Sequence, residues 1–144
     1  MSYSVDVNVL LYASDAGCDE HPKAAEFVAA CAADKELWCV AWLTLMSYMR
    51  MATHPAIFST PLSHEEAARN VDGLLALPQL RMIDEGPGFW VRYREVAQEA
   101  PVRGNLVPDA HLVTVLRQHG VKTIYTRDRD FRKFGGLKVI DPIA

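Results

Sequence analysis

The feature that most constrains this chain is an alternation along its whole length. Short hydrophobic runs rich in β-branched residues take turns with longer segments of helical period. Strands are predicted at the start of 3–14, which turns helical near Asn8, and at 37–40, 80–84, 121–126 and 137–141. Helices are predicted over 21–35, within 41–55 where the helix ends before Pro55, from Ser63 onward, over 87–100 and over 109–119, the last stopped by Gly120. Strands separated by helices favour parallel pairing through right-handed crossovers, so the sequence predicts an α/β fold.

Length and charge narrow the class of protein further. The 144 residues suit a single domain, 1–144, with neither linker nor repeat. Half of the residues are hydrophobic and the formal net charge is −3, which excludes a disordered chain and a wholly basic nucleic-acid-coating surface. Any polyanion must therefore bind at a local site.

The cysteines and the N-terminal segment indicate where the protein works. Cys18, Cys31 and Cys39 are odd in number and form no CxxC pair, which argues against a disulfide framework and a zinc knuckle. The first residues carry Asp6 and lack a basic region followed by a long apolar run, so neither a signal peptide nor a membrane span is expected. A reducing cytoplasm, without membrane attachment, is the predicted location.

Three acids follow or lead into the predicted strands. Asp6 ends the first strand, Asp128 follows the strand at 121–126, and Asp109 begins the helix that leads into that strand. Ligands of parallel sheets bind outside the carboxyl ends of the strands, so these carboxylates are expected to share one crevice. Left bare, they would repel one another and at least one would take up a proton. A divalent cation such as Mg²⁺ or Mn²⁺ removes that conflict.

Each acid also fits a structural role. Asp109 follows Pro108 at a predicted helix start, where aspartate is a common capping residue. Asp128 and Asp130 fit a turn or cap around Phe131. Asp6 lies within an apolar run, where burial of an unpaired acid is costly. No one of these acids is specific when taken alone.

Four segments stand out in order along the chain and cover nearly all of it: "VDVNVLLY", "AWLTLMSYMRMATHP", "VRGNLVPDAHLVTVLRQHG" and "YTRDRDFRKFGGLKVIDP". Together they resemble the PIN-domain ribonucleases, above all the VapC-type toxins of bacterial toxin–antitoxin pairs, in the subgroup common in mycobacteria. The resemblance implies a three-layer α/β/α sandwich, an acidic Mg²⁺ site and endonucleolytic cleavage of RNA. It also implies a VapB-type antitoxin that blocks the site, and a homodimer.

The family's acids fall on particular residues of this chain. The resemblance assigns catalysis and metal binding to Asp6, Asp109 and Asp128, with Asp130 as an auxiliary metal ligand, and matches Asn8 to an accompanying asparagine. Metal chemistry and the family resemblance imply that water attacks in line with the leaving 3′-oxygen, which leaves a 5′-phosphate and a 3′-hydroxyl. Candidate substrate-binding residues are Asn8, Arg50, Asn105 and Arg127. Cations expected to guide the RNA backbone are Arg103, Arg127, Arg129, Arg132 and Lys133.

The chain departs from the family in the helix predicted at 41–55. Many relatives carry a glutamate where this chain has Ser47, and serine is too short and neutral to replace it. Helical spacing places Trp42 and Leu45 on the expected core face and Ser47 nearly opposite. We hypothesise that Asp130, beside Asp128, supplies part of the missing negative charge. The alternative is that Asp130 serves only the turn.

Other functions compete with a nuclease. A catalytically weakened PIN-like module that binds RNA or protein is the main alternative, because Ser47 removes one acid. A haloacid-dehalogenase-like phosphatase requires a second aspartate where Asn8 stands. A phosphoacceptor receiver domain requires an aspartate at the end of a central strand with a lysine partner, and the sequence offers no evident pair.

Overall fold

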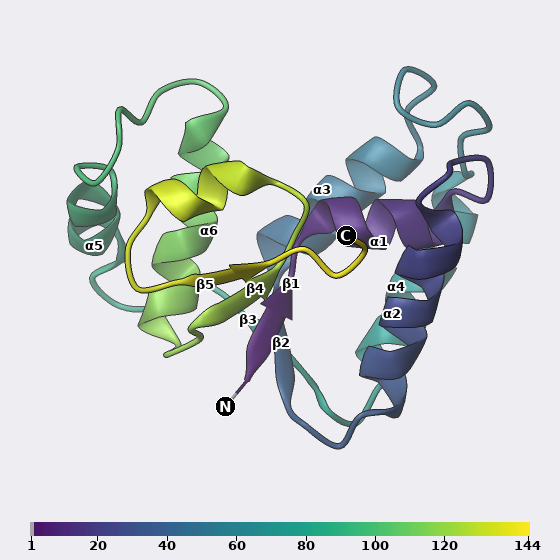
Figure 1. Cartoon of the computed structure of the whole chain (residues 1–144), viewed down its shortest axis with the longest axis horizontal. Coiled ribbons are helices and arrows are strands. Elements are labelled where there is room, and N and C mark those ends of the chain that lie inside the picture. Colours follow the sequence, from purple (N-terminus) through teal and green to yellow (C-terminus); the bar gives the residue numbers. More distant parts are fainter. Residues whose placement is uncertain (1) are drawn as a thin grey trace.

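The computed structural model describes residues 2–144, built around a five-stranded sheet with the strand order β3-β2-β1-β4-β5 (Figure 1). Every pair of neighbouring strands is parallel, as predicted. The strands are β1 (Tyr3–Val5), β2 (Trp38–Ala41), β3 (Leu80–Ile83), β4 (Thr123–Tyr125) and β5 (Lys138–Ile140). The helices are α1 (Val7–Ser14), α2 (His21–Ala33), α3 (Trp42–Ala52), α4 (His64–Leu75), α5 (Phe89–Val96), α6 (Leu106–Gln118) and the 3₁₀ helix η1 (Arg129–Lys133).

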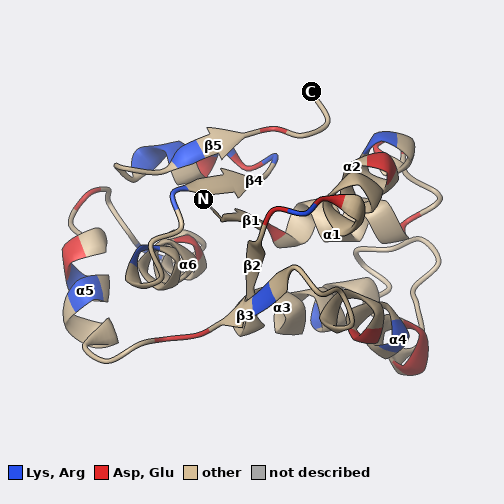
Figure 2. Cartoon of the chain, turned by 90° about the horizontal axis from the view of Figure 1, so that it is seen from below, with Lys and Arg blue, Asp and Glu red and all other residues tan. Residues whose placement is uncertain are grey.

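Helices cover both faces of the sheet, which gives the predicted α/β/α sandwich. Seen from below, α1 to α4 lie on one side of the strands and α5 and α6 on the other (Figure 2). Alternate residues of each strand feed two separate cores, because successive side chains of a strand point to opposite faces. Tyr3 and Val5 of β1 pack with the core under α1 to α4. Cys39 of β2 and Ile124 of β4 pack with the core under α5 and α6.

The chain reverses its direction of winding between β1 and β4. From β1 it moves outward through β2 to β3, then crosses over by way of α5 and α6 to pair β4 with the other edge of β1. Ser4 pairs with Ile124 and Val5 with Tyr125. The carboxyl ends of β1 and β4 therefore lie side by side at a topological switch point, where open parallel sheets bind their ligands.

Local signals in the sequence set several helix ends correctly. At the start of α4 the Ser63 hydroxyl accepts from the Glu66 N–H at 3.0 Å, and the Glu66 carboxylate accepts from the Ser63 N–H at 3.0 Å. This is the predicted capping box. Gly120 follows α6 with a φ of 68°, a left-handed conformation that favours glycine.

The predicted start of α6 is wrong. The helix begins at Leu106, with Asn105 as its N-cap residue, so Asp109 lies inside the first turn and is not the cap. Pro108 is tolerated there because the first N–H groups of a helix have no partner within the helix. The carboxylate of Asp109 is thus free of a capping role.

The predicted core face of α3 is also wrong in part. Trp42 is 42% exposed, and the buried residues are Thr44, Leu45, Tyr48 and Ala52. Tyr48 is buried because its hydroxyl has partners, at 2.8 Å from the Ser14 hydroxyl and 2.9 Å from the Asn70 amide nitrogen. A satisfied hydroxyl removes most of the cost of burying a tyrosine.

Two further observations concern the described residues. No helix among residues 2–144 is both long enough and apolar enough to cross a membrane. Cys18, Cys31 and Cys39 are free thiols.

Candidate metal centre

Asp6 directly follows β1 and is almost completely buried, with 7% of its surface exposed. It is the N-cap residue of α1, in extended backbone, and one carboxylate oxygen accepts from the Val7 N–H at 2.8 Å. The other oxygen accepts from the Thr126 hydroxyl at 2.7 Å. Because β1 stops at Val5 and α1 begins at Val7, this carboxylate is fixed at the carboxyl end of the central strand of the sheet.

Thr126 connects the acids at this edge, and the sequence reasoning missed it. Its hydroxyl donates to Asp6 and accepts from the Asp128 N–H at 2.9 Å and from the Asn8 side-chain amide at 3.2 Å. The residue is 1% exposed and directly follows β4. The sequence signal was a hydroxyl residue between a hydrophobic strand and the pair Arg127 and Asp128.

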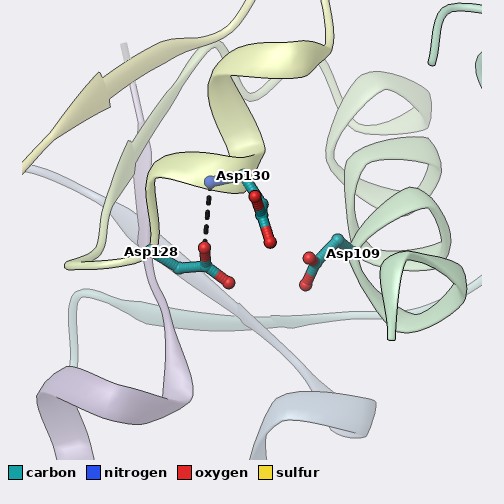
Figure 3. Close-up of side chains that lie close together, drawn as sticks. All are labelled: Asp109, Asp128 and Asp130. Carbon is teal, nitrogen blue, oxygen red and sulfur yellow. Dashed lines mark hydrogen bonds between the residues drawn. The ribbon is translucent and has the colours of Figure 1, made fainter. Parts of the chain in front are cut away.

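Asp128 and Asp130 lie at the start of η1 and project toward α6 (Figure 3). The Asp128 carboxylate caps η1 by accepting from the Asp130 N–H at 2.9 Å. The structural role anticipated for Asp128 is therefore present, and it fixes one oxygen of this carboxylate. Asp130 does not cap the turn. Its side chain is 49% exposed and forms an ion pair with Lys133 at 3.1 Å.

Asp109 completes a group of three carboxylates. It comes from the first turn of α6 and points toward Asp128 and Asp130 (Figure 3). One oxygen from each of Asp109, Asp128 and Asp130 lies within 4.8 Å of the others. Asp6 stands outside this group and joins it through Thr126. The sequence had placed Asp6, Asp109 and Asp128 at the centre and Asp130 beside them.

The electrostatics of the group are unfavourable without a cation. Burial, followed by the charges of Asp128, Asp6 and Asp130, raises the pKa of Asp109 from 3.8 to about 7, while Lys133 lowers it. Burial also raises the pKa of Asp6, against the lowering effect of its hydrogen bonds from Thr126 and Val7. The expected repulsion among the acids is therefore present.

The donor set fits a hard divalent cation. Three carboxylates from two elements can each offer an oxygen to one ion, and oxygen ligands are those that Mg²⁺ and Mn²⁺ prefer. No histidine or cysteine belongs to the group. The arrangement is thus suited to magnesium or manganese rather than to a thiolate-bound metal.

The remaining candidate residues have different surroundings. Asn8 supports the site through two side-chain hydrogen bonds. Its amide nitrogen donates to the Thr126 hydroxyl, and its side-chain oxygen accepts from the Arg127 N–H at 3.4 Å. Arg50 is exposed in the last turn of α3, about 12 Å along the axis from the start of that helix. Asn105 is exposed and makes no capping bond. Neither Arg50 nor Asn105 has a side-chain bond to the carboxylates among residues 2–144.

The fold and the site together define an α/β protein with an acidic centre at the switch point of a parallel sheet. The family described as PIN domain matches residues 3–137. A relative from Mycobacterium tuberculosis, "Ribonuclease VapC48", is 42% identical over 144 residues, which covers all of this chain and 99% of the relative. The chain belongs to the PIN-domain family and, within it, to the VapC-type proteins.

Solved structures agree with this fold. Mycobacterium tuberculosis VapC20, described as a Sarcin-Ricin loop cleaving toxin, has a TM-score of 0.69 and 18% identity, covering 95% of this chain and 99% of that one. A chain of a toxin–antitoxin complex from Klebsiella pneumoniae has a TM-score of 0.61 and 21% identity, covering 98% of both chains. At these identities the likeness concerns the fold.

Proposed function

We propose that the protein is a Mg²⁺- or Mn²⁺-dependent endoribonuclease of the VapC type, acting as a toxin. The 42% identity to a ribonuclease over the full chain supports RNA as the substrate class. The observation that carries the proposal is the group of Asp109, Asp128 and Asp130, whose oxygens lie within 4.8 Å of one another at the sheet's switch point.

The three carboxylates are proposed to hold the cation, with Asp6 completing the charge of the site. A bound Mg²⁺ or Mn²⁺ supplies a water of lowered pKa and stabilises the negative charge that develops on the phosphate oxygens. The chain's own residues set the geometry. Thr126 fixes the backbone at Asp128 through its hydroxyl and holds Asp6 with the same group.

The surrounding residues are proposed to position the RNA. Asn8 and Arg127 border the acids, and Arg127 is exposed to solvent. Arg50 and Asn105, whose side chains make no hydrogen bond to the carboxylates within residues 2–144, are proposed to contact other parts of the RNA. Hydrolysis by water in line with the leaving 3′-oxygen yields a 5′-phosphate and a 3′-hydroxyl.

The protein is further proposed to act in the cytoplasm with an antitoxin. A VapB-type partner restrains the nuclease, and a basic side chain from it would neutralise the carboxylates much as a cation does. The likeness to a chain of a toxin–antitoxin complex supports this arrangement. The free thiols fit a reducing compartment. We also propose a homodimer, on the basis of the family resemblance.

The test is RNA cleavage by the purified chain with and without divalent cations. We expect the chain to cleave RNA with Mg²⁺ or Mn²⁺ and not in the presence of a chelator. The cleavage rate should fall by more than about 100-fold in Asp109→Asn and in Asp128→Asn. Asp72→Asn, on the exposed surface of α4, is the matched control and should keep full activity. Sequencing of the RNA ends identifies the substrate. If RNA binds but is never cut, the weakened binding module suggested by Ser47 is the better description.

A further inference from the structure

A small pocket lined by three arginines and two aspartates lies directly beside the acidic group. Its volume is about 130 Å³, and Asp128 belongs both to the pocket wall and to the group with Asp109 and Asp130. Its walls come from the turn after β4, from η1, from β5 and from the segment after β5. The lining residues are Thr126, Arg127, Asp128, Arg129, Arg132, Val139, Asp141 and Ala144.

Some cations of this region already have acidic partners. Lys133 pairs with Asp130 at 3.1 Å, and the Arg127 Nε pairs with an Asp141 oxygen at 3.2 Å. The other Asp141 oxygen accepts from the Ile143 N–H at 3.0 Å. Both oxygens of Asp141 therefore have partners, and the charge of Arg127 offsets the charge of this carboxylate.

Arg129 and Arg132 differ from these cations. Both are exposed and both line the pocket. Within residues 2–144 neither has an ion pair or a side-chain hydrogen bond. Arg129 and Arg132 therefore line one pocket without an acidic partner among the described residues, although the protein as a whole carries a net charge of −3. Figure 2 shows this basic segment beside β5.

We infer that Arg129 and Arg132 form a subsite for a phosphate of the RNA that is next to, and distinct from, the phosphate that is cleaved. This inference rests on the proposed ribonuclease function and names how the site holds its substrate. Because Asp128 is shared, a strand whose scissile phosphate lies at the acidic group passes the pocket with a neighbouring phosphate.

The chemistry of the pocket favours a phosphate group. Its volume of about 130 Å³ has room for one. Guanidinium groups bind phosphate oxygens through paired N–H donors. The acidic group also repels RNA until its charge is neutralised, so a nearby cationic anchor offsets that repulsion.

The test is RNA binding in a chain that cannot cleave. All variants carry Asp109→Asn, and the probe is a fluorescein-labelled single-stranded RNA of about 12 nucleotides with mixed sequence, titrated in Mg²⁺ at several salt concentrations. Arg129→Ala/Arg132→Ala removes the subsite. Arg69→Ala/Arg92→Ala removes equal charge from exposed positions on α4 and α5 and is the control.

The subsite double variant is expected to bind RNA about tenfold more weakly than its parent. The slope of log affinity against log salt should fall by about 0.7, the value for one phosphate contact on a single strand. The control should change affinity less than about twofold. Arg129→Lys/Arg132→Lys, which keeps charge without paired donors, should lie between and serves as the test if the alanine variant fails to fold.

Equal losses in the subsite and control variants, or no loss in either, would overturn the inference. Affinity retained in the subsite variant, in a protein whose wild type cleaves RNA with divalent cations, would refute the subsite alone. A wild type that cleaves no RNA would refute the proposed function, whatever the binding results.

Discussion

Asp109→Asn is expected to stabilise the metal-free protein at neutral and alkaline pH while abolishing its activity. In the folded chain this carboxyl is half-buried and faces three other acids, so burial and their charges raise its pKa from 3.8 to about 7. A raised pKa means that the folded state holds the proton more tightly than the unfolded state. Asparagine resembles the protonated carboxyl and cannot ionise. The variant therefore avoids the free-energy cost of holding a negative charge at this half-buried position beside the other acids.

The sign and size of the effect follow from this pKa. The stability due to the protonated carboxyl is fully present below about pH 3.8, declines as the pH rises, and is lost above about pH 7. At about 1.4 kcal/mol per pH unit the difference is at most about 4 kcal/mol. Solvent reaches roughly half of the group and screens its interactions, so we expect about 2 kcal/mol at pH 8 and less than about 1 kcal/mol at pH 5.

Urea unfolding in the presence of a chelator measures the difference in stability between Asp109→Asn and wild type directly. The free energy of unfolding is compared for wild type, Asp109→Asn and the exposed control Asp72→Asn at about pH 5 and pH 8. We expect Asp109→Asn to exceed wild type at pH 8 and the gain to shrink at pH 5. A variant that is less stable than wild type at pH 8, or that matches Asp72→Asn at both values, would refute the electrostatic reasoning.

Three further predictions concern the support of the site, the cap of α4 and the binding of the metal. Thr126→Val should destabilise the chain by about 2 kcal/mol in urea unfolding and reduce cleavage, because Asp6 and the Asp128 N–H lose their partner, whereas Thr126→Ser should restore both. Ser63→Ala should cost about 1 kcal/mol through the lost α4 cap and leave cleavage unchanged. In metal titration by calorimetry, Asp130→Asn should bind Mn²⁺ more weakly and Ser47→Glu more tightly or at an additional site. If Asp130→Asn binds as wild type does and Ser47→Glu changes nothing, Asp130 does not compensate for Ser47.

The sequence predicted the fold well because its signals are local. All five strands and their parallel pairing were expected from hydrophobic runs alternating with helical segments. The start of α6 was misplaced because Pro108 was treated as preceding the helix, although the first turn accepts proline. The exposure of Trp42 on α3 could not be predicted. Which face of α3 is buried depends on the partners that the Tyr48 hydroxyl finds on α1 and α4.

The composition of the site was harder to predict than its location. The topology of the sheet explains why acids after β1 and β4 meet, and that much follows from strand order. Which three carboxylates approach most closely depends on η1, whose turn carries Asp128 and Asp130 toward α6. Thr126 was missed because a single threonine gives no pattern, and only its three hydrogen bonds reveal its role.

The most direct test of the central claim is anomalous scattering from crystals soaked in Mn²⁺. We expect one strong peak about 2.1 Å from carboxylate oxygens of Asp109 and Asp128, with Asp130 in contact directly or through water. The peak should disappear in Asp109→Asn. No peak at saturating Mn²⁺, or a peak away from these aspartates in a chain that still cleaves RNA, would contradict the assignment of this acidic group as the metal centre.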